Sequence, residues 1–125
     1  MACTCSGGSD TILVYACSGA ANTGLLADQV MRALNRDNVA DSTCLIGIGA
    51  DLSGFVESAR SATRNIVLDG CPVACGKRIF EARTLPFEHF VMTDFGVEKG
   101  KTAITGDVIE TVVASVAARI AAKAS

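Results

Sequence analysis

Four of the six cysteines in this 125-residue chain have a spacing that suits a shared metal site. Cys17, Cys44 and Cys71 follow one another at intervals of 27 residues, and Cys75 comes four positions after Cys71. An interval of this size is about the length of one strand and helix unit, so the three cysteines fall at equivalent places in successive units. Four thiolates at roughly 2.3 Å around one Zn²⁺ make a closed, structural type of site.

The two most closely spaced of these four cysteines lie in the segment "DGCPVACGKR", where a strand leads into a helix. We expect Cys71 to cap this helix and Pro72 to be its first residue, where the missing N–H costs nothing. Cys75 then falls one turn later on the same side. The N–H groups and the positive dipole of that helix end favour thiolates, the species that bind metal. The pair alone leaves metal binding, thiol redox chemistry and inert buried cysteines open.

Apolar runs rich in β-branched residues alternate with segments of helical period. We expect strands at 11–17, within 39–49, at 64–70 and at 89–95, with helices between them and a last helix over about 106–123. Asn22 or Thr23, and Ser53, are the expected helix caps. This alternation predicts an α/β fold: a small three-layer sandwich, Rossmann-like or flavodoxin-like, with a mainly parallel sheet of about four strands.

The carboxyl ends of parallel strands line the crevice where such sheets bind ligands. Cys17 and Cys71 fall at strand ends, so we expect both at this edge. The position of Cys44 depends on where its strand ends, because the apolar "LIGIG" after it would prolong the strand and leave the thiol in the core. Gly47 and Gly49 favour an earlier strand end, since glycine weakens a strand interior. We therefore predict that the thiols converge, in a site that the strand order 2-1-3-4 would suit.

Charge and composition narrow the class of protein. The formal net charge of −2 comes from scattered residues, so neither a basic stripe for nucleic acid nor an acidic tail stands out. No apolar run approaches the roughly 20 residues of a membrane helix, and the N-terminus has no signal-peptide pattern. We expect a cytoplasmic protein whose thiols are reduced, with a disulfide-stapled secreted domain as the alternative. Residues 1–10, with Cys3 and Cys5, are expected to be flexible, and 11–125 to form one domain.

Four blocks of the chain occur in a familiar order: "ACSGAANTG", "CLIGIGADL", "VLDGCPVACGKR" and "VMTDFGVEKG". Together they resemble the DGC-domain family, which is named for its Asp-Gly-Cys motif and regarded as zinc-binding. The resemblance runs from about Thr11 through the final helix. It implies that the four motif cysteines, and hence the zinc ligands, are Cys17, Cys44, Cys71 and Cys75, and it implies no substrate or reaction. Ala20 stands where many members carry a further cysteine.

Two other residues are candidates for roles near the thiols, and a third, His89, is expected away from them. Asp69 and Asp94 follow strands and are candidates to hydrogen-bond the metal ligands, although a turn or cap role suits either. His89 is the only histidine, near the start of the fourth predicted strand. In a parallel sheet that is the end opposite the cysteines, so we predict a surface or strand-edge residue and no Cys-His or His-containing zinc site.

The first loop, "CSGAANTG", resembles the phosphate loop of low-molecular-weight phosphatases. Those loops need an arginine to clamp the phosphoryl oxygens, and Thr23 stands at that position, so the phosphatase interpretation fails. An anion at the N–H groups of the following helix remains open.

The main hypothesis is one Zn²⁺ held by Cys17, Cys44, Cys71 and Cys75, with the metal ion as partner and with neither nucleic acid nor membrane. The alternative is a thiol-disulfide or sulfur/metalloid-transfer enzyme in which Cys71 attacks and Cys75 resolves. An iron-sulfur protein is a third hypothesis, because four cysteines also hold such clusters.

Overall fold

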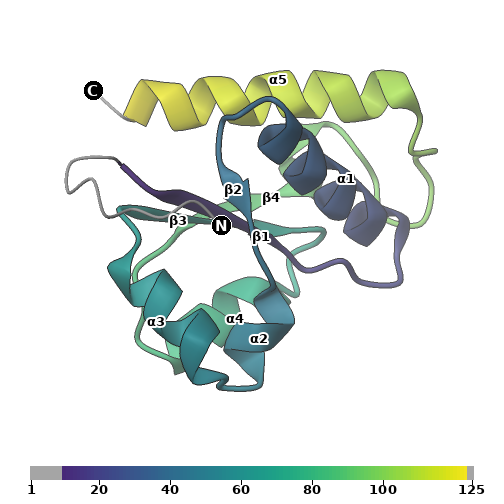
Figure 1. Cartoon of the computed structure of the whole chain (residues 1–125). Coiled ribbons are helices and arrows are strands. Elements are labelled where there is room, and N and C mark those ends of the chain that lie inside the picture. The colour runs from purple at the N-terminus through teal and green to yellow at the C-terminus, as the bar shows by residue number, and fades with distance from the viewer. Residues whose placement is uncertain (1–9, 124–125) are drawn as a thin grey trace.

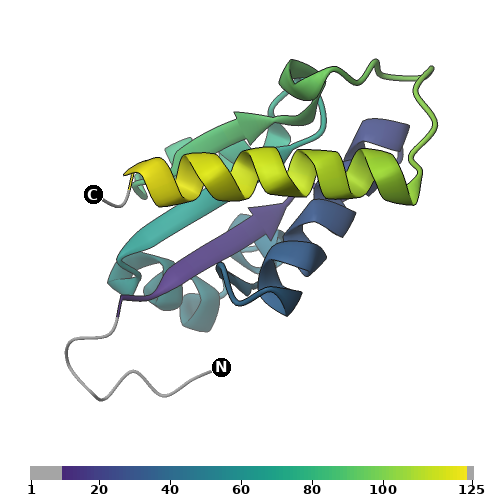
Figure 2. The same ribbon diagram turned by 90° about the horizontal axis from the view of Figure 1, so that it is seen from above.

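The computed structural model describes residues 10–123, which form a four-stranded sheet between two layers of helices (Figure 1). The strands are β1 (Ile12–Ala16), β2 (Asp41–Ser42), β3 (Arg64–Asp69) and β4 (Glu88–Val91). Their order is β2-β1-β3-β4 and every pairing is parallel. Figure 2 shows the strands pointing in one direction, with the loops that follow them at the same end. The predicted α/β class and the order that suits the site are confirmed.

The helices divide between the two faces of the sheet. Helices α1 (Asn22–Arg36) and α5 (Gly106–Lys123) cover one face, and α5 has the bounds that its apolar pattern predicts. The other face carries α2 (Leu45–Gly49), α3 (Ser53–Ser61) and α4 (Cys75–Ala82). No helix within residues 10–123 is long and apolar enough to cross a membrane.

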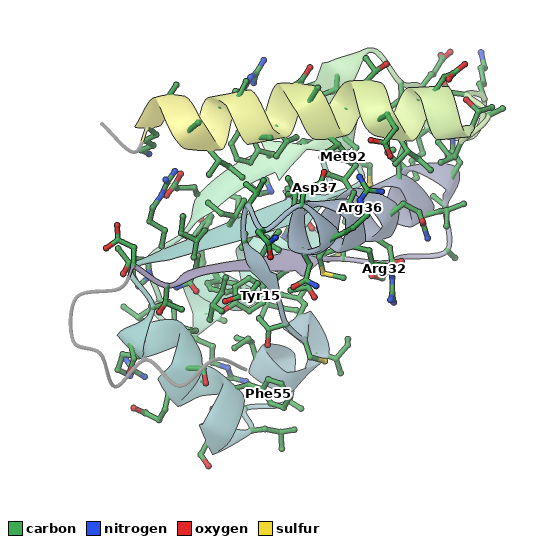
Figure 3. All side chains as sticks on the ribbon, turned by 45° about the horizontal axis from the view of Figure 1, so that its top comes forward. Tyr15, Arg32, Arg36, Asp37, Phe55 and Met92 are labelled. Atoms are coloured by element: carbon green, nitrogen blue, oxygen red, sulfur yellow. The ribbon has the colours of Figure 1, made fainter. Side chains whose placement is uncertain are left out.

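Side chains of each strand alternate between two hydrophobic cores. Val14 and Ile66 pack under α1 and α5 together with Met92, whereas Tyr15 and Val67 pack on the α2–α4 side. Figure 3 shows Tyr15 and Met92 on opposite sides of the sheet. The Tyr15 hydroxyl donates a 2.8 Å hydrogen bond to Asn65 Oδ1, and burial raises the pKa of Tyr15. Both faces of β1 and β3 are therefore buried, as a parallel sheet requires.

Two predicted strands are shorter than expected. The fourth was expected over 89–95, but β4 ends at Val91 and a 3₁₀ helix, η1 (Met92–Phe95), follows it. The second is the two-residue β2, and "LIGIG" is helix α2. Gly47 lets α2 pack closely on Phe55 of α3, because a Cβ there would lie 2.4 Å from Cδ2 of Phe55. The early strand end that the glycines indicated is confirmed.

The predicted helix caps were wrong. Helix α1 has Ala21 as its N-cap and α3 has Leu52, and neither makes a side-chain cap bond. Helix α4 begins at Cys75, so Cys71 does not cap it and Pro72 is not its first residue. The reason is a turn over 71–74, in which the Ala74 N–H donates to the Cys71 carbonyl at 3.0 Å. This turn delays the start of the helix by one turn.

Candidate metal centre

The four predicted ligands all lie at the carboxyl edge of the sheet. Cys17 directly follows β1, and Cys71 comes two residues after the end of β3. Cys75 is the first residue of α4, and Cys44 is the N-cap residue of α2 just beyond β2. All four are free thiols; Cys44 and Cys75 are exposed, whereas Cys17 and Cys71 are half-buried. Cys44 is therefore not a mid-strand core residue.

Two neighbouring cavities divide these cysteines between them. Cys17, Cys71 and Cys75 line a cavity of about 310 Å³, which we call the thiol cavity. Cys17 also lines a second cavity of about 320 Å³, which we call the side cavity, together with Cys44. Cys17 is thus the residue common to both. The structure brings three of the predicted ligands to one cavity and leaves Cys44 in the adjoining one.

The thiols are not gathered tightly enough to bind an ion as they stand. Among the side chains of residues 10–123, no group of three or more His, Cys, Asp or Glu is placed to hold a metal. Cys3 and Cys5 lie outside the described residues. Any metal bound at this edge has to draw its ligands closer together.

Two of the sulfur atoms accept hydrogen bonds from the surrounding loops. The Gly70 N–H donates to Cys17 Sγ at 3.3 Å, and Lys99 Nζ donates to Cys71 Sγ at 3.3 Å. Donors of this kind offset the negative charge of thiolate ligands and orient them, as the second shell of a metal site does. The set of donors, four thiols with a nearby ammonium, fits a zinc-thiolate site.

Asp69, the aspartate of the Asp-Gly-Cys motif, fixes the start of α4. Its carboxylate is 1% exposed. Oδ1 accepts the Gly76 N–H at 2.8 Å and Oδ2 accepts the Lys77 N–H at 3.0 Å. These are first-turn N–H groups that have no acceptor inside the helix. Asp69 therefore acts as the cap expected of Cys71, and it holds the turn of helix that carries Cys75.

His89 lies on β4, which is an edge strand of the sheet as predicted, but its predicted place at the end opposite the cysteines was wrong. Its Nε2 lies 2.7 Å from Oδ2 of Asp69, and its side chain is 20% exposed. The reason is register: β4 starts opposite Ile66, so His89 pairs with Val67, two residues before Asp69 on the same face. A strand that begins this far along its neighbour places its first residues near the cysteine edge, not at the opposite end.

The glycine of the motif allows two loops to meet. A Cβ on Gly70 would lie 2.6 Å from the carbonyl carbon of Thr23, inside the first turn of α1. No real Cβ tolerates such a distance to backbone. Gly70 therefore lets the end of β3 pack directly on the N-terminus of α1, which forms one wall of the thiol cavity.

Asn22 holds the loop that carries Lys99. Its Nδ2 donates to the carbonyls of Glu98 and Thr102 at 3.1 and 2.8 Å, and its Oδ1 accepts the Gly100 N–H at 2.7 Å. Nothing in the sequence pattern indicated this contact, because 76 to 80 positions separate the partners. The Asn22 side chain makes these hydrogen bonds in place of the predicted helix cap.

The remaining candidate, Asp94, lies in η1, is exposed and lines neither cavity. Two residues beside the thiols have left-handed backbone: Ser18 after Cys17, with φ 51°, and Ala74 before Cys75, with φ 56°. Such conformations are costly for residues other than glycine and gather at functional sites.

The chain matches the DGC domain over residues 13–116, which takes in all four cysteines. It is also 36% identical over 88 residues to the protein named Anaerobic and virulence modulator AnvM from Pseudomonas aeruginosa, a match that covers 70% of this chain and 67% of that protein. No solved structure matches it. With most of its length matched to the domain, the chain belongs to the DGC-domain family.

Proposed function

We propose that this protein binds one Zn²⁺ through the thiolates of Cys17, Cys44, Cys71 and Cys75. The observation that carries the proposal is that three of these residues line the thiol cavity, while Cys17 also borders the side cavity of Cys44. Thiolates and Zn²⁺ are matched in chemical softness. The zinc-binding character attributed to the DGC family adds support.

Binding would be coupled to closure of the loops. Cys44 and Cys75 are exposed at the N-termini of α2 and α4, and Cys17 and Cys71 lie in the loops after β1 and β3. Because the four thiols start apart, part of the free energy of metal binding would be used to order these loops. A Zn²⁺ held by four thiolates would supply structure, and its four ligands would tether the loops after β1, β2 and β3. Lys99 would reduce the net charge of −2 that such a site carries.

The thiol chemistry of these cysteines also supports a proposal for where in the cell the protein is located. Free thiols stay reduced in the cytosol, where exposed cysteines such as Cys44 and Cys75 are available to metal. We therefore propose a cytoplasmic protein, and for its role a modulating one, the word that the name of the Pseudomonas relative carries.

A thiol-disulfide reaction is the second candidate, favoured by the contact between Lys99 Nζ and Cys71 Sγ. The Cys71 thiolate would attack a substrate disulfide and release one thiolate. Cys75, in the same cavity, would then displace the second and leave a Cys71–Cys75 disulfide. The substrate would gain the two electrons that the cysteine pair loses.

Zinc competition with a chromophoric chelator tests the first proposal. We expect Cys71→Ser and Cys75→Ser each to weaken zinc binding at least tenfold. The matched control is the double variant Cys3→Ser/Cys5→Ser, which should bind zinc as the parent does. Unchanged affinity in Cys71→Ser or Cys75→Ser would exclude the four-thiolate site. Fast turnover of a disulfide substrate by zinc-free protein would instead favour the second candidate.

A further inference from the structure

Thr23 has a buried hydroxyl without a hydrogen-bond partner. The residue is 0% exposed, it contributes to the wall of the thiol cavity, and its Oγ1 has no partner. Within residues 10–123 it is the only buried side-chain nitrogen or oxygen in this condition. Buried polar groups are nearly always satisfied, so an exception that borders a cavity indicates a missing ligand or water.

The N-terminus of α1 opens at the same place. The helix has fifteen residues and no side-chain cap. In the described chain the N–H groups of Asn22 and Thr23 have no backbone acceptor, whereas those of Gly24 and Leu25 bond to the Ala21 carbonyl. Unpaired N–H groups and the positive helix dipole at such an end attract anions. The N-cap residue, Ala21, has no polar side-chain atom, and the neighbouring Asn22 side chain is engaged by the loop over 98–102.

That loop adds a positive charge to the cavity. Lys99 lines the thiol cavity, and Asn22 fixes the backbone on both sides of it. The cavity's one carboxylate, Asp69, already accepts two N–H groups and contacts His89. The hydroxyl of Thr23 and the N–H groups of α1 are therefore left for a ligand. The ammonium of Lys99 contacts Cys71 Sγ at 3.3 Å and has further N–H groups to donate.

We propose that the thiol cavity binds a tetrahedral oxyanion, a phosphate or sulfate group, between the N-terminus of α1, Thr23 Oγ1 and Lys99 Nζ. This site goes beyond the proposed zinc site because it uses no thiolate. Apart from the three cysteines and three glycines, the rest of the cavity is lined by the apolar residues Ala20, Ala21, Val73 and Ala74. Its volume of about 310 Å³ exceeds that of a bare anion, so a small organic body attached to the oxyanion also fits.

Amide NMR shifts of the full chain as purified, under reducing conditions, test this site. Inorganic phosphate, inorganic sulfate and phenyl phosphate are titrated separately at constant ionic strength, and the zinc content of the same sample is measured. We expect saturable shifts centred on the amides of Asn22 and Thr23, whose N–H groups have no backbone acceptor in the described chain. Tighter binding of phenyl phosphate would assign the site to an organic phosphate, and equal or weaker binding would assign it to the free ion.

Variants distinguish anion binding at this site from nonspecific attraction of the anion to positive charge on the protein. Thr23→Val and Lys99→Gln should each weaken binding at least fivefold. The matched controls are Thr111→Val and Lys101→Gln, exposed residues outside the cavity, which should bind as the parent does. Thr23→Val removes an unpaired hydroxyl and keeps the side-chain shape, so it should fold; Lys99→Gln lies on the surface and gives an independent answer.

Shifts that never saturate, or saturable binding that neither Thr23→Val nor Lys99→Gln weakens, would overturn the proposal. This outcome does not depend on the zinc content. Saturable anion binding by protein without zinc would support the anion site and contradict the zinc site. Zinc binding without anion binding would do the reverse, so the two proposals are tested separately.

Discussion

His89 Nε2 lies 2.7 Å from Oδ2 of Asp69, and the carboxylate of Asp69 also accepts the N–H groups of Gly76 and Lys77. One buried side chain therefore joins the end of β3, the start of β4 and the first turn of α4. Because Cys75 is the first residue of that turn of helix and Cys71 lies in the link between it and β3, the position of both thiols depends on Asp69. The aspartate of the Asp-Gly-Cys motif is thus a positioning residue for the thiol cavity.

Asp69→Asn should destabilise the protein by about 2–3 kcal/mol, because an amide has one acceptor oxygen for two N–H groups and leaves one of them unpaired. Equilibrium unfolding in urea measures the change. The matched control is Asp94→Asn, whose exposed side chain has no hydrogen bond in the described structure, and its effect should stay within about 0.5 kcal/mol. Equal effects of the two substitutions would show that Asp69 does not hold α4.

Gly70→Ala should destabilise the protein by about 1–3 kcal/mol, because the added Cβ meets backbone that cannot move aside easily. The clash is with the carbonyl carbon of Thr23, 2.6 Å from the Cβ position. Gly54→Ala is the matched control: nothing lies within 4 Å of its Cβ position in the first turn of α3, so the protein should be as stable or more stable. Thermal unfolding distinguishes them. A neutral Gly70→Ala would contradict the close contact of β3 with α1.

Ala74→Gly should stabilise the protein by up to about 1 kcal/mol, since glycine adopts left-handed backbone without the penalty that alanine pays. Ala74 has φ 56°. The same substitution at the exposed Ala118, inside α5, should have the opposite sign and cost about 1 kcal/mol. Unfolding midpoints at constant denaturant slope give both values. Loss of stability in Ala74→Gly would mean that this turn is not strained.

Glu88→Gln should weaken the dependence of stability on acid pH. Arg64 donates two 2.7 Å hydrogen bonds to the Glu88 carboxylate, and these lower the pKa of Glu88 despite its partial burial. The folded state therefore binds this proton less readily than the unfolded chain. The contribution is complete above the ordinary glutamate pKa of about 4.3, and it is lost as the pH falls through the lowered folded-state value.

Unfolding free energies between neutral and acid pH measure this contribution of Glu88. The parent should lose about 1–3 kcal/mol more than Glu88→Gln over that interval. Glu57→Gln serves as the control, because Glu57 is exposed and its contact with Arg60 is 3.5 Å long. Its pH profile should follow the parent, and a Glu88→Gln profile parallel to both would contradict the ion pair.

The repeated units of the fold were predictable from the sequence because each strand and helix has a distinct apolar period. The bounds of α5 and the cysteine edge of the sheet followed from that period and from the spacing of Cys17, Cys44 and Cys71. Parallel topology then brought the strand ends together. The strand order suited to the site was also the order observed.

What the sequence could not predict are contacts that depend on register and on distant loops. The position of His89 depends on where β4 begins along β3, and no local pattern encodes that offset. Asparagine is a residue type favoured at helix caps, yet the hydrogen-bond partners of Asn22 are far along the chain. The start of α4 depends on the backbone of Ala74, a residue type that gives no sign of left-handed conformation.

Zinc content measured together with the reactivity of the thiols, before and after chelation, tests the central proposal most directly. With one zinc held by four thiolates, we expect one ion per chain, two of the six cysteines reactive before chelation, and all six reactive after it. The two reactive residues should be Cys3 and Cys5. No bound zinc in protein purified under reducing conditions, with six thiols equally reactive before and after chelation, would contradict the four-thiolate site.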